Sequence, residues 1–462
     1  MFAPPITAKL RNDTRLGSKG PARSRSVFGS KGEAVFLLVA MGLSTTLYVG
    51  LGSLGGNALR PVQLVPCLLG AMVLLVLPCR GIAWKAVAPY LILPTLYVAY
   101  LAVRHVSAGP EGDLYLLKAM INLVAYWSIV RLLMHVGVPE FGYVGIVSGA
   151  VLSVCVSAVG VPLLGVTPHM GSGRWQGFMA GANHFGNICL LAAIPLCGWL
   201  FWGHHKGVAR SLIIGTWLVC LVGIVMSGSR AVLGIAVLGH LFLYALAVLA
   251  SPKAVLRRQS MATGGLAIGV LSVALWAFHD FIPTRVVQFV ADGRLFYTAY
   301  ASDARHELHG IAFSFFREAP IIGAGMDAAR FEVAHEQHGF HETSSHSTYL
   351  HLLSVSGGLG FALYMLLPGY LAVQLAASFR AKRFSTGRQR MSCMIALVVM
   401  AVLGLHATVI SLTNAMHIWI IFGVASYAVM EMHTCSGQPL FVNAPRARRW
   451  TAGASASVAH GR

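Results

Sequence analysis

The chain has 462 residues, of which 56% are hydrophobic and only 11% are charged. A soluble globular domain has about 25% charged residues, so this composition excludes an ordinary water-soluble protein and indicates a membrane protein. The formal net charge of +19, from 34 Lys and Arg against 15 Asp and Glu, is also typical of a nucleic-acid-binding protein. The positions of these charges along the chain decide whether that interpretation holds.

Apolar runs recur along the whole chain. A transmembrane helix needs about 20 mainly apolar residues to cross the hydrocarbon core of a bilayer. We expect twelve such helices, at about 34–51, 61–78, 87–103, 114–131, 141–165, 183–202, 211–227, 230–250, 263–282, 347–376, 391–412 and 415–432. Ser227-Gly228-Ser229-Arg230 separates the seventh from the eighth, and Thr413-Asn414 separates the last two.

The positive charges predict the orientation of these helices, because Lys and Arg accumulate in short cytoplasmic loops. With the N-terminus in the cytoplasm, 24 of the 34 cations lie on the cytoplasmic side, nine lie on the opposite side, and Lys118 lies inside a span. An even number of spans returns the C-terminus to the cytoplasm. The net charge is then mainly a determinant of topology, and we expect no nucleic-acid partner.

The predicted organisation follows from these spans. A basic cytoplasmic tail, expected to be disordered, covers 1–33, and the first nine spans cover 34–282. A large periplasmic loop covers 283–345, the last three spans cover 346–432, and a cytoplasmic tail covers 433–462. The fold class is an all-α polytopic membrane protein with one long extracytoplasmic loop that carries short helices.

The long loop has an unusual composition. Together with Asp280 at its edge it carries nine of the fifteen acidic residues, and it is rich in histidine. Loops of this length in compact proteins are usually functional or disordered. The spacing of apolar residues from Ile311 to Phe316 predicts a short amphipathic helix lying on the membrane.

All nine outward-facing cations are arginines. The arginine guanidinium is planar and always charged, and it matches phosphate with two hydrogen bonds. Arg230 is notable because it lies at a membrane edge on the side where positive charge is disfavoured. Its side chain either extends to lipid headgroups or holds an anionic group, and we favour the second interpretation.

Two further segments place polar residues beside spans. Arg174 lies among glycines, and Asn183 and His184 open the following span, which a flexible loop with a capped helix explains as well as a binding site does. His346 opens the tenth span. A histidine at a membrane interface can act as a general base because imidazole titrates close to neutral pH, although on this segment alone a helix-capping role is favoured.

The segment that begins at His346 resembles the signature of the O-antigen ligase and O-antigen polymerase superfamily. His346 and Ser347 are followed, after nine residues, by Gly357 and Gly360, as in the family pattern of His, Asn/Ser/Gln, nine residues and Gly-x-x-Gly. Asn is commoner than Ser at the second position of that pattern.

Three other elements of the family are matched in order upstream. Arg305 is followed by Pro320-Ile321-Ile322-Gly323-Ala324-Gly325, which is similar to the family's Arg and Pro-apolar-apolar-Gly-x-Gly element. Ser229-Arg230-Ala231 resembles its Ser-Arg-Gly/Ala element, although Gly228 precedes the pair, and Gly177 to Asn183 resembles its Gly-x-n-Asn element. The O-antigen ligase-like region therefore covers about residues 174–360.

The resemblance implies a membrane glycosyltransferase of lipopolysaccharide or exopolysaccharide assembly in the bacterial inner membrane. The family moves a glycan from undecaprenyl diphosphate to an acceptor on the periplasmic face, either lipid A-core in a ligase or another lipid-linked repeat unit in a polymerase. Direct attack at the anomeric carbon would invert its configuration. No cofactor or metal is expected, and the outward loop contains no Asp-x-Asp pair.

The resemblance also implies a role for each matched residue. His346 is the expected general base, and Arg230, Arg305 and, less strongly, Arg174 are the expected diphosphate-binding residues. The supporting residues would be Ser347, Gly357, Gly360, Asn183, Gly323 and Gly325.

Other functions remain open at this stage. A polysaccharide transporter or a flippase for lipid-linked oligosaccharides also often has twelve spans, but no internal repeat is evident and Lys118 is the one clear charge within a span. A protein O-oligosaccharyltransferase would share the same residues, and the lack of a large acceptor domain after the last span disfavours it. The sequence does not separate ligase from polymerase.

Overall fold

The computed structural model describes residues 31–44, 61–76, 84–108, 113–159, 174–179, 181–202, 205–250, 299–325, 346–381, 384, 386–410 and 415–435. The regular structure of these residues consists of helices: α1 (Lys31–Ser44), α2 (Pro61–Val76), α3 (Trp84–Ala108), α4 (Asp113–Val136), α5 (Phe141–Val159), α6 (Ala182–Trp202), α7 (Gly207–Met226), α8 (Arg230–Ala250), α11 (Ala299–Glu318), α13 (Thr348–Arg380), α14 (Gly387–His406) and α15 (Met416–Cys435).

The helices agree with the predicted all-α membrane class. Each predicted span except 263–282, which lies outside the described residues, coincides with a helix. In the described part of the chain, α3 to α8, α13 and α14 are long and apolar enough to cross a bilayer, and α1 and α2 contain shorter apolar helices. The count of twelve spans, the membrane orientation and the bounds of the loop and tails remain predictions.

The predicted break between the seventh and eighth spans is confirmed. Helix α7 ends at Met226 and α8 begins at Arg230. Gly228 in the turn has a φ of +61°, a conformation that glycine adopts at little cost. The Ser227 hydroxyl donates to the carbonyl of Ile224 at 2.6 Å and accepts from the Ser229 amide at 3.2 Å, so the turn is closed by its own side chain.

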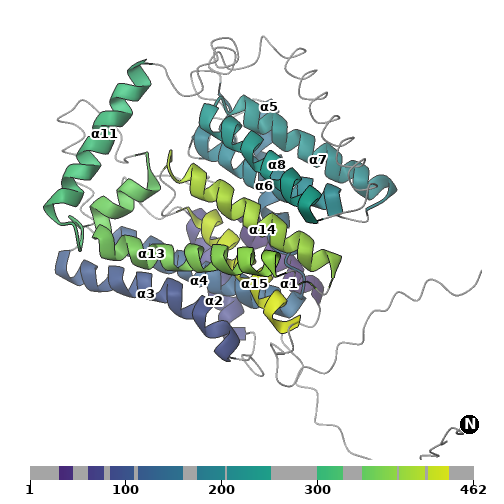
Figure 1. Ribbon diagram of the computed structural model, residues 1–462, viewed down its shortest axis with the longest axis horizontal. Helices are drawn as coiled ribbons and strands as arrows, with labels where there is room; N and C mark the ends of the chain where they lie inside the picture. The colour runs from purple at the N-terminus through teal and green to yellow at the C-terminus, as the bar shows by residue number, and fades with distance from the viewer. Residues whose placement is uncertain are drawn as a thin grey trace, which may run out of the picture.

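Helix α14 joins the two parts of the bundle. Helices α5 to α8 lie together in Figure 1, and α14 packs against α6 and α8 on one side and against α13 and α15 on the other. Small residues allow close crossings elsewhere, as where α1 meets α5: a Cβ on Gly145 would lie 2.6 Å from the Cα of Gly42. Such small-residue contacts are a usual source of helix association in membranes.

Helix α11 differs from the short surface helix predicted around 311–316. It is 20 residues long, and it packs on α13 at one end of the bundle (Figure 1). Leu308, Ile311, Ala312 and Phe315 are buried at helical spacing, so its amphipathic character is confirmed. The expected length was wrong because the charged residues before Ile311 continue the helix. Its apolar side faces α13, and contact with the membrane remains a prediction.

Candidate functional site

Arg174 binds the turn between α7 and α8 to the start of α6. Its Nε donates to the carbonyl of Ser227 at 2.8 Å, and its Nη2 donates to Oδ1 of Asn183 at 2.9 Å. The Trp175 amide adds a bond of 2.9 Å to the carbonyl of Met226. The structure therefore brings together the two candidate residues Arg174 and Asn183, and Arg174 also holds the backbone of the α7–α8 turn.

Arg230 is the first residue of α8, directly after this turn, and its side chain is partly buried. Its guanidinium makes no hydrogen bond or ion pair to another of the described residues. A cation at a helix N-terminus is disfavoured by the helix dipole, whereas an anion there is stabilised by both the dipole and the arginine. Arg230 thus has the electrostatic setting of an anion-binding residue.

Arg305 lies on α11, which packs on α13. The position of its side chain is outside what the structure describes, so its predicted role in diphosphate binding remains untested. Its backbone places it on the helix next to the one that follows Ser347.

His346 lies in a strained turn immediately before α13. Its φ is +52°, and among the described residues it is the one non-glycine residue with a positive φ. The turn is held by Thr348, whose amide donates to the carbonyls of Ala407 at 2.8 Å and Ile410 at 3.1 Å, and whose hydroxyl donates to Ile410 at 2.7 Å. Ser347 caps α13 by accepting from the Leu350 amide at 3.4 Å. Strain that is held in this way is typical of functional sites.

His346 lies near the N-terminal turn of α6. It is partly buried, and it lies close enough to His184 for the two imidazoles to interact electrostatically. His184 follows Asn183, which accepts from Arg174. The structure therefore places the predicted base at the same end of the bundle as Arg174 and the turn that leads to Arg230.

The predicted glycines form a single structural unit. Gly357 interrupts α13 with a φ of +65°, and the loop Pro320–Gly325 fills the interruption. The amides of Ala324 and Gly325 donate to the carbonyls of Ser354 and Val355 at 2.8 and 3.1 Å, and the amides of Gly358 and Leu359 donate to Pro320 and Ile321 at 2.8 and 3.0 Å. The backbone groups that the break in α13 frees are thus satisfied by the loop.

The close approach of backbone explains the residue type at these positions. Gly323 has a φ of +76° and Gly325 a φ of +100°, and a Cβ on Gly323 would lie 2.5 Å from the Gly357 nitrogen. A Cβ on Gly360 would lie 2.7 Å from the ring of Tyr100. These glycines support the shape of the site and offer no ligand-binding side chain.

Two residues of α3 belong to this unit and were missed as site residues. The Tyr100 hydroxyl lies 2.8 Å from the Ser356 carbonyl and 3.1 Å from that of Ile322, and Arg104 Nη2 donates to the Gly323 carbonyl at 3.0 Å. Arg104 is one of the nine arginines predicted to face outward, which was the available signal. Its bond to a loop more than 200 residues away is not readable from local sequence.

A buried polar set beside the site was missed as well. His406 Nδ1 donates to Oδ1 of Asn187 at 2.7 Å, and Asn187 Nδ2 donates to Nε2 of His417 at 3.2 Å. His184 lies near both histidines. Polar and ionisable residues in apolar helices mark functional positions more often than chance, which was the signal that could have drawn attention to them.

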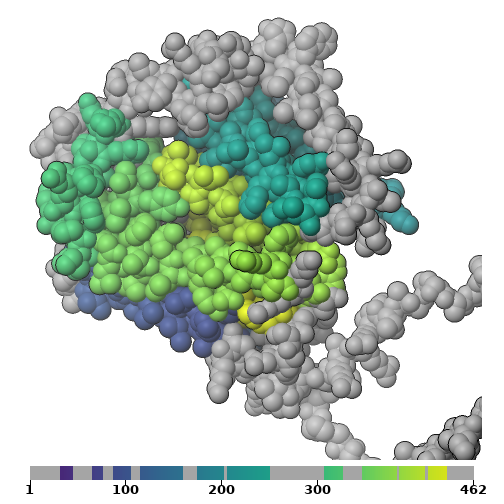
Figure 2. Space-filling model, viewed as in Figure 1, coloured from purple at the N-terminus to yellow at the C-terminus, as the bar shows by residue number. Residues whose placement is uncertain are grey.

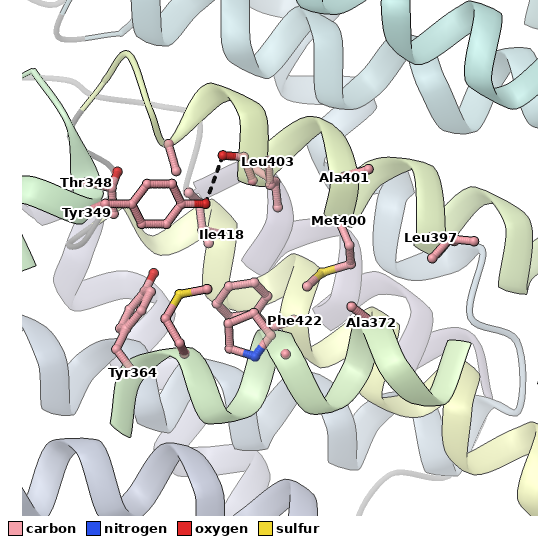
Figure 3. Close-up of a pocket in the computed structure, with 15 residues that line it drawn as sticks. Thr348, Tyr349, Tyr364, Ala372, Leu397, Met400, Ala401, Leu403, Ile418 and Phe422 are labelled. Atoms are coloured by element: carbon pink, nitrogen blue, oxygen red, sulfur yellow. Dashed lines mark hydrogen bonds between the residues drawn. The ribbon is translucent and has the colours of Figure 1, made fainter. Parts of the chain in front are cut away.

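An apolar cavity of about 240 Å³ begins at Thr348, two residues after His346, and extends between α13, α14 and α15. Figure 3 shows the side chains of Tyr349, Tyr364, Met400 and Phe422 around it, with the Tyr349 hydroxyl bonded to the carbonyl of Gly404 at 2.9 Å. In Figure 2 the surface is hollowed between α13 and α14. The lining is almost entirely hydrocarbon: Thr348, Tyr349, Tyr364, Met365, Pro368, Gly369, Ala372, Leu397, Met400, Ala401, Leu403, Gly404, Ala407, Ile418 and Phe422.

The helices and this polar end define a polytopic helical membrane protein with a candidate site at one end of its bundle. Residues 214–365 match the family model described as O-antigen ligase. This match confirms the resemblance to the O-antigen ligase and polymerase superfamily over those residues. The match includes Arg230, Arg305 and His346 but begins after Arg174 and Asn183. A comparison with curated proteins gave no match.

Proposed function

We propose that the protein transfers a glycan from undecaprenyl diphosphate to an acceptor hydroxyl on the periplasmic face of the bacterial inner membrane. The observation that carries the proposal is the position of the His346 turn: it lies near the N-terminal turn of α6, which Arg174 ties to the α7–α8 turn before Arg230. These elements lie in or beside the region that matches the O-antigen ligase family.

In this proposal His346 is the general base. Its imidazole takes the proton from the acceptor hydroxyl while that oxygen forms a bond to the anomeric carbon of the donor. The bond from the anomeric carbon to the diphosphate oxygen breaks, the electron pair leaves with undecaprenyl diphosphate, and the configuration at the anomeric carbon is inverted. The strained turn held by Thr348 supports this role because it fixes the direction of the imidazole.

Arg230 and Arg305 bind the diphosphate, with Arg174 contributing more weakly. A diphosphate leaving group gains charge as its bond breaks, and guanidinium groups at a membrane-embedded site stabilise that charge strongly. The setting of Arg230 at the start of α8 supports its part in this binding. Arg174 already donates two hydrogen bonds to the protein, which supports ranking it below the other two.

The apolar cavity accommodates part of the isoprenoid chain of the donor. It is lined by hydrocarbon and starts at Thr348, so a lipid lying in it has its diphosphate end next to the His346 turn. The flexible side chains of Met365 and Met400 suit an irregular apolar ligand.

The acceptor is either lipid A-core or a growing lipid-linked polysaccharide. The experiment is to delete the gene in its bacterial host, examine the surface polysaccharide, and restore it with the full-length chain. Loss of glycan from lipid A-core identifies a ligase, whereas accumulation of single repeat units identifies a polymerase. Movement of lipid-linked glycan across proteoliposomes by the purified protein, without covalent transfer, would contradict the proposal and identify a flippase.

A further inference from the structure

Three polar side chains meet inside the bundle and bind three helices together. Asn187 of α6, His406 of α14 and His417 of α15 are 0%, 1% and 3% exposed. The Asn187 carbonyl oxygen can only accept, so His406 Nδ1 carries the proton of that bond, and the Asn187 amide donates to an unprotonated Nε2 of His417. The asparagine thereby fixes the tautomer of both imidazoles.

His406 is connected to the turn that carries His346. It is the last residue of α14, and residues 407–410 follow it directly. Within those residues the carbonyls of Ala407 and Ile410 accept from the amide and hydroxyl of Thr348 at 2.7 to 3.1 Å. A displacement of His406 therefore displaces the acceptors that hold the backbone of His346 in its left-handed conformation.

Asn187 is connected to the other half of the site. Asn183 lies one turn before it on the same side of α6, and Asn183 accepts from Arg174. Gly186, between them, is in close contact with Ser227 of the turn before Arg230, since a Cβ there would lie 2.7 Å from the Ser227 hydroxyl oxygen. The stretch of α6 from Asn183 to Asn187 thus contacts Arg174 directly, and it is connected through His406 to the turn that carries His346.

We propose that Asn187 and His406 are positioning residues for the transfer reaction. Their buried hydrogen bond sets the separation between His346 and the N-terminal turn of α6, where the acceptor hydroxyl and the diphosphate meet. The inference rests on the proposed glycan transfer and adds two residues that act through His346 without touching substrate. A hydrogen bond between membrane helices contributes little to stability on average. Stabilisation of the fold therefore explains little of why these polar groups are buried here.

The test is a kinetic comparison in full-length protein reconstituted in proteoliposomes, with lipid-linked glycan and acceptor extracted from the deletion strain. We expect Asn187→Leu, which keeps the side-chain size, to lower kcat about 100-fold, as a misplacement near 1 Å does, with little change in KM. Tyr126→Phe is the matched control, because it likewise removes two buried bonds between helices, each of 2.8 Å, from α4 to the Tyr90 carbonyl of α3 and to the Ser426 hydroxyl of α15. That variant keeps its kcat.

A double-mutant cycle separates positioning from a general loss of structure. In a His346→Ala background the Asn187→Leu change is expected to cost nothing further, because the group it positions is gone. A kcat of Asn187→Leu equal to that of the unaltered protein, or a loss that multiplies with that of His346→Ala, would overturn the inference. Absence of glycan transfer by the unaltered protein would instead overturn the proposed function.

Two substitutions of His406 keep the test decisive if Asn187→Leu does not fold. The amide nitrogen of an asparagine takes the place of Nδ1, which makes the bond to Asn187, whereas that of a glutamine takes the place of Nε2. His406→Asn is therefore expected to keep most of its kcat and His406→Gln to lose it. Equal activity of the two variants would contradict the role given to this bond.

Discussion

The loop that fills the break in α13 gives a prediction whose size follows from the structure. In Gly323→Ala the new Cβ would lie 2.5 Å from the Gly357 nitrogen, whereas an ordinary van der Waals contact needs about 3.4 Å, so the loop has to move by about 1 Å. The φ of +76° adds about 1–2 kcal/mol of conformational cost for a residue with a Cβ. The backbone bonds between the loop and α13 must lengthen in response.

We expect Gly323→Ala to lower stability by at least that conformational cost and to lower glycan transfer about 100-fold, because the shifted loop lies against the helix that follows His346. Thermal unfolding of the purified protein and complementation of the deletion strain measure the two effects. Gly310→Ala in α11 is the matched control, since its Cβ meets nothing within 4 Å, and it should keep full activity. Normal stability and activity of Gly323→Ala would refute the reasoning.

Three further changes test the proposed chemistry. His346→Ala is expected to lower transfer about 10²- to 10⁴-fold with the protein still inserted, and near-normal transfer would remove its assignment as the base. Arg230→Lys is expected to fail in complementation because an ammonium cannot bind phosphate through two parallel N–H groups as a guanidinium does. Full activity would indicate that Arg230 only reaches lipid headgroups. Gly369→Leu fills the apolar cavity at a position where a Cβ meets nothing within 4 Å, and it should raise the KM for the lipid-linked donor. Gly215→Leu in α7, equally unobstructed, should leave that KM unchanged.

The sequence predicted the positions of the described helices well because apolar runs of this length are typical of helices that cross a bilayer. The turn at Ser227-Gly228 was predictable because a continuous helix would exceed the membrane thickness. The extent of α11 was not predictable, since the residues before Ile311 are mostly polar or small, and Leu308 alone does not form a helical pattern of apolar residues.

The candidate site was predictable only where its residues are neighbours in sequence. Arg174 and Asn183 lie nine residues apart, and both were singled out as candidates, although their hydrogen bond was not predicted. The bonds of Arg104 to Gly323 and of Asn187 to His406 join residues more than 200 positions apart, and both depend on how helices pack. Hydropathy reports how deeply a helix is buried but not which helix it meets, so these partners needed the structure.

The interrupted helix α13 has a consequence for how the chain can be divided and recombined. Backbone that departs from a helix is tolerated in a membrane span only when protein supplies its hydrogen bonds, and here the supplier is the loop Pro320–Gly325, which precedes the helix. The backbone hydrogen bonds at the break in α13 form only when that loop packs against the helix, and Arg104 of α3 donates a hydrogen bond to the same loop. A chimera that takes the loop Pro320–Gly325 from one relative must therefore take the α13 interruption and the facing residues of α3 from the same parent, because hydrogen bonds join the three segments into one unit.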